Sequence, residues 1–125
     1  GDPSTHDWVI AGDLNDYTET DGTPDQNHGL DPLLSNGFSF NLVKNIPDPR
    51  NRWTHFYSED NSYHQLDYIL VSPSLREKNP DLQPRIIRKG QPYRAERYVA
   101  DRWPRIGYER PKASDHCPLA IDLNY

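Results

Sequence analysis

Three short polar motifs in this chain hold residue types that can bind a divalent cation and move protons. The motifs are Gly12-Asp13-Leu14-Asn15-Asp16, Gln65-Leu66-Asp67-Tyr68-Ile69 and Ser114-Asp115-His116-Cys117-Pro118. Carboxylate and amide oxygens are the ligands that hard divalent cations prefer. An imidazole held by a carboxylate serves as a general acid or base near neutral pH. The candidates for such chemistry are therefore Asp13, Asn15, Asp67, Asp115 and His116.

Each motif taken alone also has a purely structural interpretation. Asp13 and Asn15 follow an apolar run and a glycine, where such side chains often cap turns. Asp115 before an apolar run is typical of a turn as well, and an isolated histidine is more often a core or surface residue. Asp67 is the exception, because a carboxylate inside an apolar strand costs several kcal/mol unless it is paired. The functional interpretation therefore depends on the three motifs meeting in space.

The motifs stand at the ends of predicted strands or inside them. The apolar run Asp7 to Ala11, ended by Gly12, predicts a buried strand that delivers Asp13 to a loop. Trp53 to Ser58 and Tyr63 to Ser72 predict an antiparallel hairpin with a four-residue loop. Both faces of its second strand are largely apolar, so we expect a central strand covered on both sides.

The remaining elements are shorter. Asp31, Pro32 and Gly37 punctuate a predicted helix of about two turns, with Asp31 as its N-cap. Alternating apolar residues in Cys117 to Leu123 predict a closing strand. Further predicted elements are a strand over Phe38 to Val43, a helix over Ser72 to Asn79, a strand over Leu82 to Arg88 and a proline-interrupted excursion over Gln91 to Lys112.

In order and spacing, the three motifs resemble the second half of the endonuclease/exonuclease/phosphatase family, also described as DNase I-like. The likeness covers most of residues 7 to 123. It implies an α+β fold with one mostly antiparallel sheet and flanking short helices, which is half of a DNase I-like two-sheet β-sandwich. The 125 residues are then a single domain, the C-terminal half of the family's catalytic domain, with a basic insertion over 85 to 112.

The resemblance implies metal-dependent hydrolysis of a phosphodiester bond. Asp13 would orient or deprotonate the attacking water, and Asn15 would donate a hydrogen bond to the phosphate or the incoming oxygen. His116 would contact the scissile phosphate, and Asp67 would accept from its ring N–H and fix its tautomer. Asp115, with Asp13 and Asn15, would hold Mg²⁺ or Mn²⁺.

The family's early asparagine and its metal-binding glutamate belong to a first half that this sequence does not contain. Three protein ligands are few for Mg²⁺, which sheds its water reluctantly. We therefore expect this chain alone to bind Mg²⁺ weakly and to hydrolyse phosphodiesters slowly. An apolar sheet face left without its partner sheet also predicts association, either as a homodimer or with a first-half chain.

Charge is distributed unevenly along the chain. The net charge is -5, yet residues 85 to 112 hold nine of the 14 basic residues against three acidic ones. Tyr93, Tyr98, Trp103 and Tyr108 are interleaved with these basic residues. Such a segment suits phosphate contacts and base stacking. The alternative is a solvated loop whose arginines pair with the acidic body.

Other readings of the composition are weaker. The stretch from Asp13 does not fit an EF-hand, because the required glycine and final glutamate are replaced by Thr18 and Pro24. The histidines outside the motifs are scattered and lack paired cysteines, so the sequence does not predict a structural zinc site. Cys117 is the only cysteine, no apolar run is long enough to span a membrane, and localisation stays open.

Three functions remain in competition. The first is a nuclease. The second is a phosphatase or phosphodiesterase acting on a phospholipid head group, an inositol phosphate or a nucleotide, since these motifs act on the phosphate and not on what it carries. The third is a non-catalytic interaction module on the same scaffold. The absence of an arginine directly before Leu66 and Asp67, where relatives often have one, gives some weight to an unusual substrate.

Overall fold

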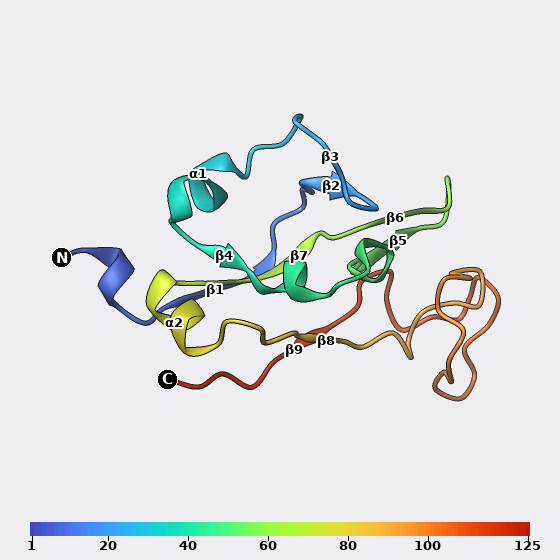
Figure 1. Ribbon diagram of the computed structural model, residues 1–125. Helices are drawn as coiled ribbons and strands as arrows, with labels where there is room; N and C mark the ends of the chain where they lie inside the picture. The colour runs from blue at the N-terminus through green and yellow to red at the C-terminus, as the bar shows by residue number, and fades with distance from the viewer.

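The computed structural model describes residues 1–125 and has a three-stranded antiparallel sheet at its centre (Figure 1). The strands are β1 (Val9–Asp13), β7 (Asp67–Val71) and β4 (Phe40–Asn41), in the order β1-β7-β4. β7 is the middle strand, as its apolar composition predicts, and Tyr68 to Val71 are buried. In the register of β1 on β7, Asp13 lies opposite Asp67.

Three further sheets have two strands each, so the fold is a mixed α+β structure with four small antiparallel sheets. They pair β2 (Glu19–Thr20) with β3 (Thr23–Pro24), β5 (His55–Tyr57) with β6 (Ser62–His64), and β8 (Arg85–Ile86) with β9 (Leu119–Ala120). The expectation of one mostly antiparallel sheet is wrong in this respect. Prolines contribute to the interruption, because Pro84 and Pro118 directly precede β8 and β9 and cannot donate to a ladder.

The predicted hairpin is present, but its second strand is divided. β5 and β6 form the hairpin, and the chain leaves the ladder at Gln65 and Leu66 before β7 begins. The reason is a side chain: Thr54 Oγ1 accepts hydrogen bonds from the backbone N–H groups of Leu66 and Asp67, both at 3.0 Å. The predicted strands over 38–43, 82–88 and 117–123 are likewise shorter than expected, at two residues each.

The helices are short. They are α1 (Asp31–Leu34) and α2 (Pro73–Lys78), with 3₁₀ turns at Pro3–Thr5, Ser35–Gly37, Leu42–Asn45 and Pro49–Asn51. Ser72 caps α2, because its hydroxyl accepts from the N–H of Leu75 at 3.3 Å. The predicted N-cap of α1 is wrong by one residue, since Leu30 occupies that position and Asp31 is the first helical residue. None of these helices has the length and apolar character to cross a bilayer.

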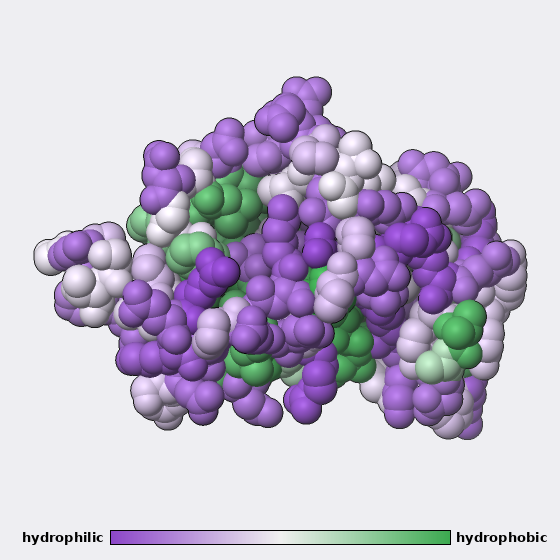
Figure 2. Space-filling model, in the orientation of Figure 1, coloured by the Kyte–Doolittle hydropathy of each residue, from purple (hydrophilic) through white to green (hydrophobic).

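The core consists of three small clusters around β7 and the hairpin. Ile69 and Val71 pack with Leu42 and Leu75, while on the other face of β7 Tyr68 and Leu70 pack with Leu30. The third cluster lies under the hairpin and contains Trp53, Phe56, Ala95 and Cys117. The space-filling view shows a mainly hydrophilic surface, with an apolar patch beside α1 (Figure 2). β7 is therefore held from both sides, which fixes where its first residue, Asp67, stands.

Candidate active site

Two carboxylates meet at one end of the central sheet. Asp13 is the last residue of β1 and Asp67 is the first residue of β7, and the antiparallel register sets them opposite each other. The side chain of Asp67 is 19% exposed and that of Asp13 is 46% exposed. The sequence places Asp13 in a loop after the strand, whereas the structure keeps it within the ladder.

His116 joins these carboxylates from a distant part of the sequence. Its Nδ1 lies 2.8 Å from Asp67 Oδ2, and its Nε2 lies 3.8 Å from Asp13 Oδ2. The distance to Asp67 is within the range for a hydrogen bond. Because an ionised carboxylate only accepts, Nδ1 is the donor, and the neutral ring carries its proton there. Nε2 is then the nitrogen that faces outward for chemistry.

The backbone of the hairpin holds the histidine in place. His116 forms a β-bridge with His55, the N–H of Phe56 donates to Asp115 O at 3.0 Å, and the N–H of Cys117 donates to Thr54 O at 2.6 Å. The same Thr54 binds the backbone of Asp67 through its hydroxyl. Thr54 and the first residues of β5 therefore position both partners of the Asp67–His116 hydrogen bond.

The charges around His116 favour its protonated form. Partial burial opposes a positive charge there, but the hydrogen bond that His116 donates to Asp67 and the nearby Asp13 and Asp115 raise the pKa of His116 above its ordinary value. Burial also opposes the charge of Asp115, yet its hydrogen bond with His55 leaves the pKa of that carboxyl below its usual range. The carboxylates around His116 thus stabilise a proton on its ring, and His55 stabilises the ionised form of Asp115.

Asn15 stands beside this group in a left-handed backbone conformation, with φ at 55°. Its N–H donates to Asp13 Oδ1 at 2.8 Å, which closes a tight turn and steadies the carboxylate. Its side-chain amide makes no hydrogen bond to the protein and is exposed. The turn interpretation and the site interpretation of this motif are therefore compatible, because the backbone serves one and the side chain remains available for the other.

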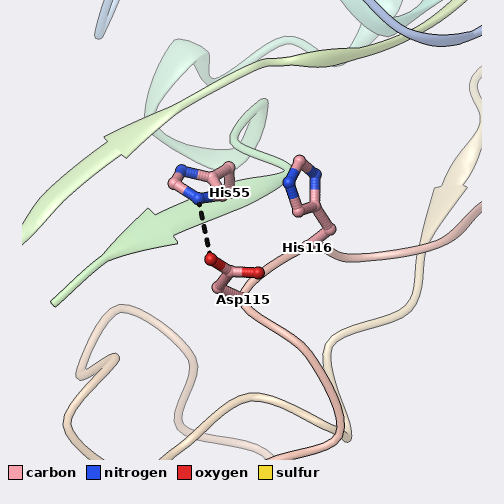
Figure 3. A group of neighbouring side chains, drawn as sticks. All are labelled: His55, Asp115 and His116. Carbon is pink, nitrogen blue, oxygen red and sulfur yellow. Dashed lines mark hydrogen bonds and ion pairs between the residues drawn. The ribbon is translucent and has the colours of Figure 1, made fainter. Parts of the chain in front are cut away.

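Asp115 does not join Asp13 and Asn15 in one close group. Its Oδ2 lies 3.3 Å from His55 Nε2. Figure 3 marks this hydrogen bond with a dashed line. The structure instead has two groups that share His116. One is Asp13, Asp67 and His116, the other is His55, Asp115 and His116, and the potential ligand atoms within each group lie within 4.8 Å of one another. His55 is a site residue that sequence reasoning missed, since nothing in its local sequence signals that it pairs with the Ser-Asp-His segment.

The comparison with protein families shows the family of the chain. The model of the endonuclease/exonuclease/phosphatase family matches residues 1–116. The chain belongs to the endonuclease/exonuclease/phosphatase family. This confirms the resemblance found in the sequence, and the family is one of metal-dependent phosphoesterases. No curated protein and no solved structure matches the chain.

The oxygen donors at the site fit the divalent cation on which this phosphoesterase family depends. Asp13 and Asp115 form no ion pair with a lysine or an arginine, so their carboxylates are free to meet a cation. The amide of Asn15 offers a further oxygen. Oxygen donors of this kind fit Mg²⁺ or Mn²⁺ chemically. These donors are few and are divided between two groups.

A cavity lies next to Asp67 and His116. This cavity of about 530 Å³ lies between the central sheet and the β8–β9 pair, and its lining includes Gly12, Asp67, His116 and Trp103. Glycine at position 12 leaves open space beside the strand end, since nothing lies within 4 Å of where a side chain would begin. The two site residues therefore border a concave surface that can receive part of a substrate.

Proposed function

We propose that this chain carries the proton-transfer part of a metal-dependent phosphodiesterase site that acts on nucleic acid. The observation that carries the proposal is the hydrogen bond of 2.8 Å between Asp67 and His116, with Asp13 3.8 Å from the outer ring nitrogen. A carboxylate that fixes one nitrogen of an imidazole, with a second carboxylate at the other, is an arrangement suited to general acid–base chemistry.

Each side chain has a defined task in this proposal. Asp67 accepts from Nδ1–H and keeps Nε2 of His116 directed at the phosphate, where it donates to a non-bridging or leaving oxygen. Asp13 orients the attacking water and takes its proton, and the amide of Asn15 donates to a phosphate oxygen. Bound Mg²⁺ or Mn²⁺, held through Asp13 and Asn15, would neutralise charge on the phosphate, whereas Asp115 lies in the separate group with His55.

The basic segment supports nucleic acid as the substrate. Some of its cations are already engaged: Arg97 pairs with Asp21 and Arg94 pairs with Glu109. Others form no ion pair or side-chain hydrogen bond, and three aromatic side chains stand exposed among them. The free cations are Arg85, Arg105, Arg110 and Lys112, and the exposed rings belong to Tyr93, Trp103 and Tyr108. Free cations between exposed rings suit a single-stranded phosphate backbone with stacked bases.

The activity test uses the chain in excess over a labelled DNA oligonucleotide, with Mg²⁺ or Mn²⁺ at millimolar concentration. We expect slow cleavage that is lost in His116→Gln and in Asp13→Asn, while Asp60→Asn in the exposed hairpin loop leaves the rate unchanged. Equal rates for the wild type and His116→Gln would contradict the proposal. An RNA oligonucleotide and a glycerophosphodiester tested in parallel identify the substrate class.

If the free cations contact DNA, they affect how the binding affinity depends on salt concentration. Replacement of Arg105 and Arg110 by alanine should weaken DNA binding similarly for every sequence and reduce the slope of log affinity against log salt concentration by about 2. Measurement by fluorescence anisotropy at several salt concentrations gives this slope directly. An unchanged slope would remove the basic segment from the substrate contact.

The architecture also supports a proposal about the fold. We propose that the β1-β7-β4 sheet is one half of a two-sheet sandwich and that its uncovered part receives a second sheet. Val9, Ala11 and Asp13, which alternate along β1, are all exposed. β1 is also an edge strand with one free side. A first-half segment of the same fold would cover this edge and bring further oxygen ligands to the cation.

A further inference from the structure

The second group of side chains at the site has its own chemistry. Figure 3 shows His55 pointing toward Asp115, with the ring of His116 beside them; His55 comes from the hairpin, and Asp115 and His116 come from the Ser-Asp-His segment. His55 Nε2 lies 3.3 Å from Asp115 Oδ2, and one potential ligand atom of each residue lies within 4.8 Å of the other two. Two imidazoles and one carboxylate therefore face one another.

We infer that His55, Asp115 and His116 form a binding site for a divalent cation that accepts nitrogen ligands, with Zn²⁺ as the best fit. Zn–N and Zn–O bonds of about 2.0–2.1 Å set neighbouring ligand atoms of a tetrahedron roughly 3.3 Å apart. The separation of His55 Nε2 and Asp115 Oδ2 already has this value. Three protein ligands leave the fourth position open to water or substrate.

His116 has a free nitrogen for this role. Nδ1 is engaged with Asp67 at 2.8 Å, so Nε2 remains as the ligand atom. Histidines that bind metals usually donate their other N–H to a carboxylate, which fixes the ring and strengthens the ligand. Asp67 makes this contact with His116. The group thus has an outer partner of the kind that zinc sites have.

The backbone holds the three ligands before any cation arrives. Residues 54–56 and 115–117 are joined by the His55–His116 bridge and by the hydrogen bonds that flank it. His55 is the most buried of the three side chains, at 15% exposed, whereas Asp115 is 48% exposed. The backbone hydrogen bonds therefore fix the positions of the three residues, while the Asp115 carboxylate is exposed to solvent. A cation can reach the group without unfolding of the chain.

The ligand set separates this group from the Mg²⁺ position. Mg²⁺ prefers six oxygen ligands and keeps several waters, whereas imidazole suits Zn²⁺, Co²⁺ and Ni²⁺. No lysine or arginine pairs with Asp115, and the carboxylate of Asp13 adds negative charge 3.8 Å from His116 Nε2. A cation at this group takes the nitrogen that the proposed function directs at the phosphate. Binding of Zn²⁺ and donation to phosphate by His116 therefore exclude each other, although the cation site does not depend on the proposed function.

The test is calorimetric titration of the 125-residue chain with Zn²⁺ in the presence of excess Mg²⁺. We expect one Zn²⁺ per chain at micromolar affinity or tighter. Co²⁺ in place of Zn²⁺ should give the intense visible absorption of a four-coordinate ion. His55→Phe retains a ring of similar shape without its nitrogens and should weaken binding by roughly 100-fold or more. Asp115→Asn should weaken it too, and Asp67→Asn by roughly 10-fold through the orientation of His116.

His64→Phe is the matched control. His64 stands opposite His55 in the same hairpin, so these two histidines could chelate a cation without Asp115. Its ring stacks on Tyr17 and its Nε2 lies 3.2 Å from Thr20 Oγ1, which assigns it a structural role elsewhere. We expect His64→Phe to retain Zn²⁺ affinity. Loss of binding in His64→Phe but not in Asp115→Asn, or no Zn²⁺ binding by a wild-type chain with a cooperative melting transition, would overturn the inference.

Discussion

Asp67 is the side chain on which the orientation of His116 depends. Replacing it by asparagine keeps the shape of the side chain, but an amide can present either an acceptor or a donor to Nδ1. We predict that Asp67→Asn lowers phosphodiester cleavage by roughly 10- to 100-fold, because part of the population then carries the wrong ring tautomer. The ¹⁵N chemical shifts of the His116 ring report the tautomer independently of activity. An unchanged tautomer together with unchanged cleavage would show that Asp67 is only a structural partner.

Thr54 controls the place where the hairpin ends and β7 begins. It is fully buried, and its hydroxyl accepts from two backbone N–H groups, those of Leu66 and Asp67. Thr54→Val keeps the volume but removes the acceptor from both donors, so we predict a loss of about 2 kcal/mol or more in the free energy of unfolding. Urea denaturation measures this loss. Thr23→Val, at an exposed position whose hydroxyl makes no hydrogen bond to the protein, is the control and should change stability by less than about 0.5 kcal/mol.

At the scale of single elements, β7 and α2 form one unit with the start of the chain. Ser72 directly follows β7 and caps α2, and its hydroxyl also accepts from the N–H of Trp8 at 3.2 Å. We predict that Ser72→Ala lowers the free energy of unfolding by about 1 kcal/mol, since the cap of α2 and the partner of Trp8 are lost together. Thermal unfolding monitored by circular dichroism tests the prediction. A change no larger than that of Ser58→Ala, whose side chain has no hydrogen-bond partner, would contradict it.

At the scale of the whole molecule, one ion pair ties the basic segment to the body. Arg97 donates two hydrogen bonds to Asp21, at 2.7 and 2.8 Å, and lies 4.3 Å over the ring of Tyr63. The guanidinium beside it holds the pKa of Asp21 below its ordinary value. A depressed carboxyl pKa in the folded state stabilises the fold above the unfolded pKa of about 4, and this contribution is lost as the pH falls through the lower folded value.

The lowered pKa of Asp21 in the folded state leads to a prediction about stability and pH. Asp21→Asn should lower the free energy of unfolding by about 1 kcal/mol at neutral pH, and the difference from the wild type should shrink as the pH falls well below 4. Denaturation curves over a pH series measure the difference. A constant difference at all pH values would mean that Asp21 acts through shape and not through charge.

The uncovered edge of the central sheet leads to a prediction about association. Val9 and the other exposed residues of β1 leave an apolar strand at the edge, and such edges pair readily with another chain. We predict concentration-dependent dimers in sedimentation velocity. Val9→Lys should reduce dimerisation, while Val99→Lys, at a position 90% exposed in the basic segment, should not. A single monomeric species at high concentration would contradict the prediction.

The sequence by itself determined the local features of this protein. Apolar runs placed β1, β7 and the hairpin, and Ser72 with Pro73 placed α2, because periodicity and capping are properties of neighbouring residues. The three polar motifs identified the family and the candidate side chains for the same reason. A carboxylate inside a buried strand also predicts a partner, and Asp67 has one in His116.

Only the tertiary structure decided which of these side chains meet. Asp115 pairs with His55 and not with Asp13, and Thr54 divides a run that reads as one continuous strand. The first outcome depends on backbone hydrogen bonds between segments about 60 residues apart, and no local pattern encodes that register. The second depends on the Thr54 hydroxyl, which accepts from residues 12 and 13 positions further along the chain. The short strands have the same origin, because their length is limited by the partner that each strand finds in space and not by its own propensity for strand formation.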